Sequence, residues 1–139
     1  MSAFETATRF FHACETLQGW EGCKDYVAAG AIFSAQSEPL VDIHSVEDYC
    51  EWVAGLGKGP LAGCEYELHS CSYDEDNRAA IFFATFSGKH TGDGGPVAPT
   101  LQQTKTDYVY VLTMDAAGKV AKMCKIWNAP WALKELGWA

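Results

Sequence analysis

Residues 107–137 constrain the fold most strongly, because they predict two apolar strands, a tight hairpin and a short amphipathic helix. Residues 107–114 and 119–127 are rich in Val, Ile, Tyr and Trp, and Asp-Ala-Ala-Gly separates them. Gly118 can adopt the positive φ that such a turn requires. A strand pair this apolar, followed by a capped helix, indicates the rear wall of a cavity.

Pairing Met114 with Lys119 predicts the register of this hairpin. Antiparallel partners share a face and successive residues alternate between faces. One face then carries the pairs Leu112 with Ala121, Tyr110 with Met123, and Tyr108 with Lys125. The other face carries Val109, Val111, Cys124 and Ile126. Because both faces are largely apolar, one should cover the core and the other a partner subunit, so we expect a homodimer.

The length and charge of the chain limit its partners. At 139 residues, one domain spanning residues 1–139 can bury enough surface to fold without a metal or a disulfide. A net charge of -8 disfavours nucleic acid and anionic membranes as partners, since both require clustered Lys and Arg. No segment approaches the roughly 20 apolar residues of a membrane span, and no basic segment precedes a hydrophobic run at the N-terminus. We expect a cytoplasmic protein.

The cysteines and histidines indicate no metal site and no cofactor. The six cysteines lack C-x-x-C spacing and lie among apolar residues, as reduced core thiols do. His12, His44 and His69 are scattered along the sequence, which disfavours a shared metal ion.

The remaining elements predict three helices, then a curved antiparallel sheet, and with the terminal helix this order is α+β. Apolar residues at helical spacing predict a first helix that ends near Gln18, and a second short helix begins near Trp20. Residues 31–35 predict a strand. Ser45 with Asp48 resembles a capping box for a third helix, which glycines 55, 57 and 59 should end. Residues 64–73 and 78–90 predict strands, and a Gly/Pro-rich loop over residues 91–100 leads to the final hairpin.

This order, with particular motifs, resembles the SnoaL-like polyketide cyclases of the NTF2-like superfamily. The motifs are Gly-Lys-Val at 118–120, the closing sequence WNAPWALKELG at 127–137, and KHTGxGG at 89–95. The resemblance implies a cone-shaped barrel with helices packed on a curved antiparallel sheet, a pocket between them, and often a homodimer through the outer sheet face. It implies functions from cyclase and isomerase to non-catalytic binding.

The catalytic acids of these relatives are not retained. In ketosteroid isomerases of the superfamily, a tyrosine and a neutral carboxylic acid polarise a carbonyl while a carboxylate moves the proton. The corresponding positions here are Phe11, Tyr110 and Ala35. Phe11 has no hydroxyl and Ala35 cannot accept a proton, so the base and one donor are missing. The general acid/base aspartate of the cyclases corresponds to Asn128, which cannot exchange protons near neutral pH. Asn128 is then a helix cap or a contact to a ligand oxygen, and the cap is the favoured interpretation.

A different polar set remains in the predicted cavity. Its catalytic candidates are His90, Lys125 and Tyr110. Burial beside tyrosines would lower the pKa of Lys125 and make it a proton acceptor or an imine-forming amine. Alternatively, the Lys125 amine lies in water at the rim, paired with Asp107 or Glu135. His90 either takes part in acid/base chemistry or bonds to backbone at the start of the glycine-rich loop.

Three functions follow from this sequence. The first is binding of a small, largely apolar molecule with an aromatic or carbonyl group. The predicted ligand contacts are Phe11, Trp52, Phe86, Tyr108, Met123, Trp127 and Asn128. The second is a cofactor-free isomerase, cyclase or lyase that uses His90, Lys125 and Tyr110. The third is a dimeric scaffold whose outer sheet face docks another protein.

Overall fold

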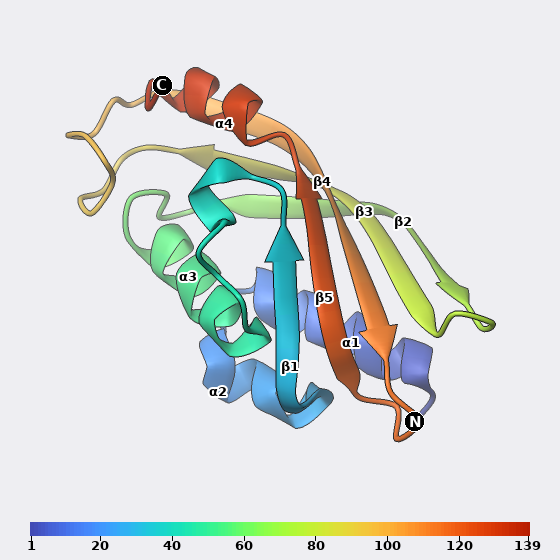
Figure 1. Cartoon of the computed structure of the whole chain (residues 1–139). Coiled ribbons are helices and arrows are strands. Elements are labelled where there is room, and N and C mark those ends of the chain that lie inside the picture. Colours follow the sequence, from blue (N-terminus) through green and yellow to red (C-terminus); the bar gives the residue numbers. More distant parts are fainter.

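The computed structural model describes residues 1–139 and contains four α-helices and five strands (Figure 1). Two single-turn 3₁₀ helices, Lys24–Tyr26 and Glu38–Leu40, lie between them. The helices are α1 (Ala3–Glu15), α2 (Gly19–Cys23), α3 (Val46–Lys58) and α4 (Ala129–Leu136). The strands are β1 (Val27–Ala35), β2 (Glu65–Asp74), β3 (Ala79–Lys89), β4 (Gln103–Met114) and β5 (Val120–Trp127).

The five strands form one curved sheet in the order β1-β5-β4-β3-β2. Strands β2 to β5 are antiparallel neighbours, as predicted, but β1 runs parallel to β5, and their arrows point the same way in Figure 1. The prediction of a wholly antiparallel sheet is therefore wrong at this edge. No hairpin joins β1 to β5, because α3 and three strands come between them in the chain, so turn geometry does not dictate their direction.

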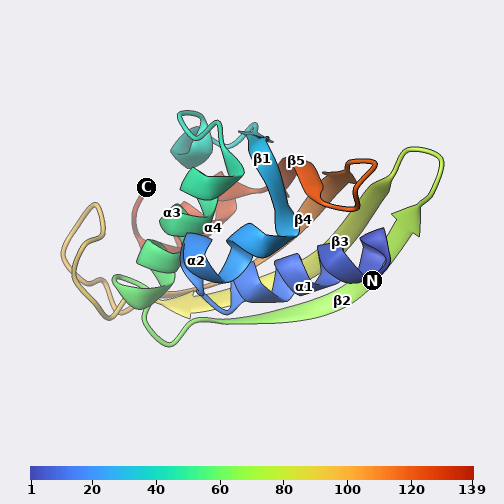
Figure 2. The same ribbon diagram turned by 90° about the horizontal axis from the view of Figure 1, so that it is seen from below.

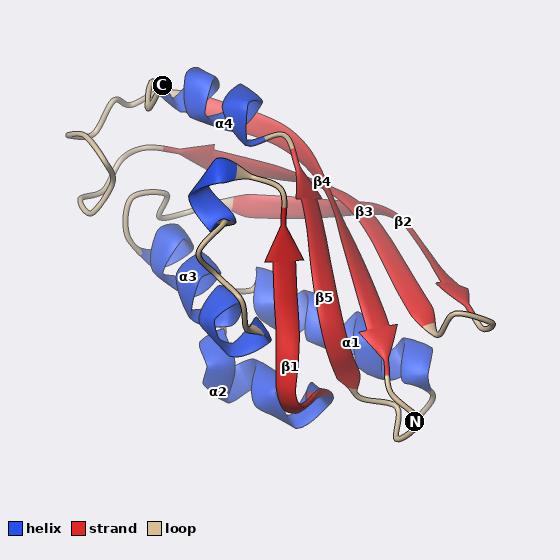
Figure 3. Cartoon of the chain, in the orientation of Figure 1, coloured by secondary structure: helices blue, strands red, loops and turns tan.

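Helices α1 and α3 cover the concave side of the sheet, and α1 lies along it in Figure 2. Serine caps open both helices: Ser2 accepts from Glu5 N at 3.1 Å, and Ser45 accepts from Asp48 N at 3.1 Å. In Figure 3, α4 lies at one end of the sheet, beside the loop that joins β3 to β4. The fully buried side chains between these layers include Phe10, Phe11, Tyr49, Phe82 and Tyr110.

Two helix boundaries differ from the sequence prediction. α1 ends at Glu15 rather than near Gln18, because Leu17 turns into the left-handed region at φ 64°. α3 continues through Gly55 and Gly57 to Lys58, and only Gly59, its C-cap, ends it. A Cβ on Gly57 would lie 2.6 Å from the Leu17 side chain, so this glycine allows α3 to approach the end of α1.

The final hairpin is present, but its register is two residues from the predicted one. Tyr110 pairs with Lys125 instead of Met123. The Asp115 carboxylate accepts the N–H groups of Ala117 and Lys119 at 3.0 and 2.9 Å, which closes a longer loop than the one predicted.

A bulge near Met114 absorbs the extra residue, Ala121, within this hairpin. Because the shift is two residues from Lys122 to Trp127, the side chains of this stretch keep their predicted faces. Tyr108, Tyr110 and Lys125 therefore point inward, and each is at most 8% exposed. Before the bulge the prediction is wrong, because Val120 pairs with Met114 and is buried on the inner face, where Ala121 was expected.

The outer face of the sheet is apolar, as predicted. Its exposed large apolar side chains are Ile32, Ile81, Phe83 and Ile126, at 54%, 37%, 40% and 59% exposure. Cys71 also lies on the surface, so the expectation that all six cysteines are core residues is wrong for this one. None of the helices has the length and apolar character needed to cross a bilayer.

Candidate functional site

A cavity of about 410 Å³ lies between α3, α4 and the sheet end where β4 begins. Its walls are mostly apolar. Trp52 and Leu56 come from α3, Phe86 from β3, and Trp127 from the end of β5. The residues that close it from α4 and the C-terminus are Ala132, Leu133, Leu136 and Trp138.

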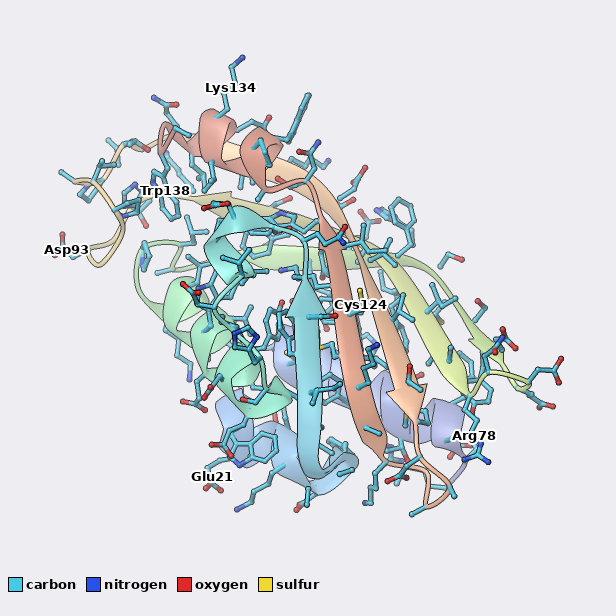
Figure 4. The ribbon with its side chains drawn as sticks, in the orientation of Figure 1. Glu21, Arg78, Asp93, Cys124, Lys134 and Trp138 are labelled. Carbon is cyan, nitrogen blue, oxygen red and sulfur yellow. The ribbon has the colours of Figure 1, made fainter.

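The rim loop, residues 91–100, contributes Gly94, Gly95 and Pro96 to the cavity wall. Figure 4 shows Trp138 beside this loop, which also carries Asp93. The loop therefore forms part of the pocket rim. A pocket of this size and lining suits a small organic ligand.

The polar end of the cavity is made by Glu15, Tyr108 and Lys125, which are buried and come from α1, β4 and β5. Lys125 Nζ donates to the Tyr49 hydroxyl at 3.0 Å, and the Tyr49 and Tyr110 hydroxyls bond to each other at 2.5 Å. A short chain of polar groups thus runs from the cavity into the core.

Lys125 has no carboxylate partner, although it is only 8% exposed. Five aromatic rings surround its Nζ, with centroids 4.7 to 5.9 Å away, Trp127 being the nearest. Burial lowers the pKa of Lys125 from 10.5 to about 8, while the nearby Glu15 carboxylate and the Cys14 thiol act to raise it. The alternative that its amine lies in water, paired with Asp107 or Glu135, is wrong.

Glu15 is the functional candidate that the sequence reasoning missed. It is 8% exposed, and its Oε1 is buried without a hydrogen-bond partner. Burial raises the pKa of this carboxyl, against the lowering effect of Lys125 and of the Tyr110 and Tyr108 hydroxyls. The sequence does contain a signal for this residue. Glu15 follows Phe11 by four residues, so this acid lies on the apolar stripe of the first helix.

Tyr108 adds a second polar group without a partner. Its hydroxyl is buried and makes no hydrogen bond. Burial and the Glu15 carboxylate raise the pKa of Tyr108, and the same two causes raise the pKa of Tyr110. Both phenols therefore remain protonated at neutral pH, and Tyr108 can donate to a ligand oxygen.

The predicted site residues separate into two groups in space. Those that line the cavity are Trp52, Phe86, Tyr108, Lys125 and Trp127. Phe11, Met123 and Tyr110 are fully buried and lie outside its lining. Phe11 stacks on Phe82 with ring centroids 4.9 Å apart, because the inner face of β3 packs directly against α1.

His90 lies behind the rim and does not line the cavity. Its Nδ1 accepts from Trp138 Nε1 at 2.9 Å and from Thr100 N at 3.2 Å. The alternative of a hydrogen bond to backbone is thus the one observed. His90 fixes Trp138, which is itself part of the cavity wall.

Asn128 caps α4, since its side chain accepts from Trp131 N at 3.3 Å. It is not among the residues that line the cavity. The favoured interpretation of this residue, a helix cap, therefore matches its position.

The one group of side chains with metal-ligand geometry lies away from the cavity. The thiols of Cys14, Cys23 and Cys50 approach within 4.8 Å of one another and are buried between the first three helices. Three sulfur atoms suit a soft ion, but no His, Asp or Glu completes the group. None of the three lines the cavity.

No family model and no characterised protein sequence matches this chain. Solved structures match closely in shape. A candidate SnoaL-like polyketide cyclase from Jannaschia sp. is 18% identical, with a TM-score of 0.77 over 96% of this chain and 90% of that one. An NTF2-like protein from Burkholderia thailandensis is 14% identical, with a TM-score of 0.70 over 94% of each chain. The chain has the NTF2-like fold.

A third structure with this NTF2-like fold has a bound small molecule. It is a protein with a ketosteroid isomerase-like fold from Catenulispora acidiphila, in complex with trimethylamine. It is 11% identical, with a TM-score of 0.70 over 97% of this chain and 94% of that one. At these identities the likeness establishes the fold and leaves the activity open.

Two of the three positions that correspond by resemblance to isomerase catalytic residues lie next to Lys125 in the sheet. Ala35 is the partner of Lys125 on β1, and Tyr110 is its partner on β4. The position expected for a base therefore holds a methyl group, and a lysine lies beside it. Within this NTF2-like fold, the polar residues that line the cavity are Glu15, Thr104, Tyr108 and Lys125.

Proposed function

We propose that this protein binds a small, largely apolar molecule that carries a carbonyl or similar oxygen function, in the cavity between α3, α4 and the sheet. One observation carries the proposal. Glu15 Oε1 and the Tyr108 hydroxyl are buried at the polar end of the cavity near each other, and neither makes a hydrogen bond of normal geometry. Buried polar groups are nearly always hydrogen-bonded, so a pair left free beside a hollow fits a ligand that completes them.

The lining supports an orientation for this ligand. Trp52, Trp127 and Phe86 offer flat apolar surfaces to its body. Lys125 and Tyr108 supply donors at one end, and a protonated Glu15 would supply a third. The oxygen of the ligand would therefore point toward β4 and β5. The trimethylamine complex of the Catenulispora protein is consistent with small-molecule binding in this fold.

Matched ligands test the proposal. In native mass spectrometry and thermal-shift assays, 2-acetonaphthone should bind roughly tenfold more tightly than 2-ethylnaphthalene, because only the ketone satisfies the buried donors. Ala132→Phe should abolish binding, since Ala132 is 2% exposed and lines the cavity. Ala116→Phe, in the exposed β4–β5 loop, is the matched control and should bind normally. Equal binding of the two naphthalenes, or no binding of either, would overturn the proposal.

A second candidate function is proton-transfer catalysis of the isomerase, cyclase or lyase type. Glu15 favours it, because a carboxyl with a raised pKa beside a cavity suits a general acid or base. Lys125 and Tyr108 would polarise the substrate, while Tyr110 bonds to Tyr49 behind Lys125 and His90 holds Trp138 at the rim. Once a substrate is known, Glu15→Gln should remove turnover and retain binding. Unchanged turnover would exclude this role.

We further propose a homodimer that buries the outer sheet face, where Phe83 and Ile126 are exposed. Light scattering should give twice the chain mass, and Phe83→Glu with Ile126→Glu should give a monomer. A wild-type monomer would instead favour the third function, a face that docks another protein.

A further inference from the structure

We propose that Lys125 captures the carbonyl carbon of the ligand covalently as an imine, with Glu15 and Tyr108 assisting. This inference rests on the proposed function and goes one step further, because it assigns a reversible bond to a named atom. Lys125 lines the cavity, so its amine is within reach of a ligand oriented by its oxygen. Imine formation needs a primary amine, a nearby acid and an enclosed apolar site, and these three features coincide here.

The placement of Lys125 is rigid. Its strand lies inside the sheet, where Ala35 on β1 and Tyr110 on β4 flank it through backbone pairing. Its Nζ makes one hydrogen bond, to Tyr49, and no salt bridge. By contrast, Lys24 pairs with Glu21 at 2.8 Å on the surface. The buried amine of Lys125 is therefore not consumed by an ion pair and is free to react.

The environment favours the reactive form of this amine. Only the neutral amine has the lone pair that attacks a carbonyl. With a pKa of about 8, about 10% of Lys125 is neutral at pH 7, compared with about 0.03% of an ordinary lysine. The titratable groups that face it are Glu15 and Cys14 from α1, Tyr49 from α3, and Tyr108 and Tyr110 from β4.

The step balances with groups already in the cavity. Nζ forms a bond to the carbonyl carbon, the C–O π electrons move to oxygen, and the Tyr108 hydroxyl stabilises the oxygen. One Nζ proton passes to this oxygen and gives a carbinolamine hydroxyl. A protonated Glu15 carboxyl gives that hydroxyl a second proton so that it leaves as water, and the resulting Glu15 carboxylate takes the remaining Nζ proton. The net change is amine plus carbonyl to imine plus water, with no oxidation or reduction.

Reductive trapping tests this bond. Wild-type protein is incubated with 2-naphthaldehyde and sodium cyanoborohydride at pH 7, and intact mass and peptide mapping follow the adduct. We expect one adduct, at Lys125, formed roughly tenfold or more faster than at any of the surface lysines. Its rate should level off above pH 8, whereas surface lysines should react faster up to pH 10.

Three variants separate the reaction from binding. Lys125→Met should lose the single adduct, and Lys122→Met, an exposed lysine on the same strand, should retain it. Glu15→Gln should slow trapping roughly tenfold or more while still binding 2-naphthalenemethanol, which has the same rings but no carbonyl.

The outcomes distinguish the two proposals. Binding of 2-naphthalenemethanol with no adduct at Lys125, or with adducts spread over surface lysines, would overturn the imine and leave the binding function intact. Failure of both the alcohol and the aldehyde to enter the cavity would overturn both.

Discussion

Methionine in place of Lys125 is expected to raise the free energy of unfolding at pH 7 by up to about 3 kcal/mol. The lowered pKa, about 8 against 10.5, corresponds to that energetic cost of burying the ammonium. Methionine has a similar shape and no charge, and replacing a buried charge with an apolar residue is often stabilising. Some of the gain will be offset, because the interactions of the ammonium with Glu15 and the surrounding rings are lost.

The pH dependence identifies the cause. Between pH 8 and 10.5 the unfolded chain binds more protons at Lys125 than the folded protein does, so the stability contributed by this residue rises with pH. The advantage of Lys125→Met should therefore be largest below pH 8 and shrink toward pH 10.5. The relevant quantity is the difference in free energy of unfolding between the wild type and Lys125→Met at each pH. This difference isolates Lys125, because both proteins contain the neighbouring titratable groups Glu15, Cys14, Tyr49, Tyr108 and Tyr110.

Urea unfolding from pH 7 to pH 10 measures this difference. Lys122→Met serves as the matched control, because Lys122 is exposed on the same strand and should change little at any pH. If the difference in free energy of unfolding between Lys125→Met and the wild type stayed constant with pH, it would contradict the explanation that desolvation lowers the pKa of the Lys125 amine.

Alanine in place of Phe11 is expected to cost about 3–5 kcal/mol of stability. The ring is fully buried, stacks on Phe82 at 4.9 Å and meets the edge of Tyr110 at 5.4 Å. Its removal leaves a void in the core, because backbone elements on both sides hold the neighbouring rings in place. Since total stabilities are about 5–15 kcal/mol, this is a large fraction.

Denaturant unfolding of Phe11→Ala and Phe11→Leu checks this prediction, with the leucine variant expected to lose less. Folded Phe11→Ala should keep most of its affinity for 2-acetonaphthone, since Phe11 does not line the cavity. A specific loss of binding with little loss of stability would return Phe11 to the ligand contacts that the sequence predicted.

Hydrophobic periodicity and turn chemistry were sufficient to predict most of the fold. The alternation of β4 and β5 placed Tyr108 and Lys125 on the inner face even though the register was wrong, because the error was two residues. The bulge at Ala121 could not be read from the sequence, since it depends on how the Asp115 side chain closes the turn. The parallel pairing of β1 with β5 also depends on tertiary packing.

The site was predicted less completely than the fold. Aromatic walls follow from strand alternation, but whether a ring faces a core or a hollow depends on the depth of packing, as Phe11 and Trp52 illustrate. Glu15 was overlooked because it lies at the end of the first helix, which was expected to continue to Gln18. An acid on an apolar helical stripe is the signal that would have identified it.

A crystal structure of the protein with 2-acetonaphthone tests the central claim most directly. We predict the naphthyl rings inside the cavity, in contact with Trp52 and Trp127, with the ketone oxygen within hydrogen-bonding distance of Tyr108 or Lys125. Two results would contradict this claim. In one, side chains fill the cavity and the naphthyl rings bind outside it; in the other, Glu15 pairs directly with Lys125 and blocks the polar end of the cavity.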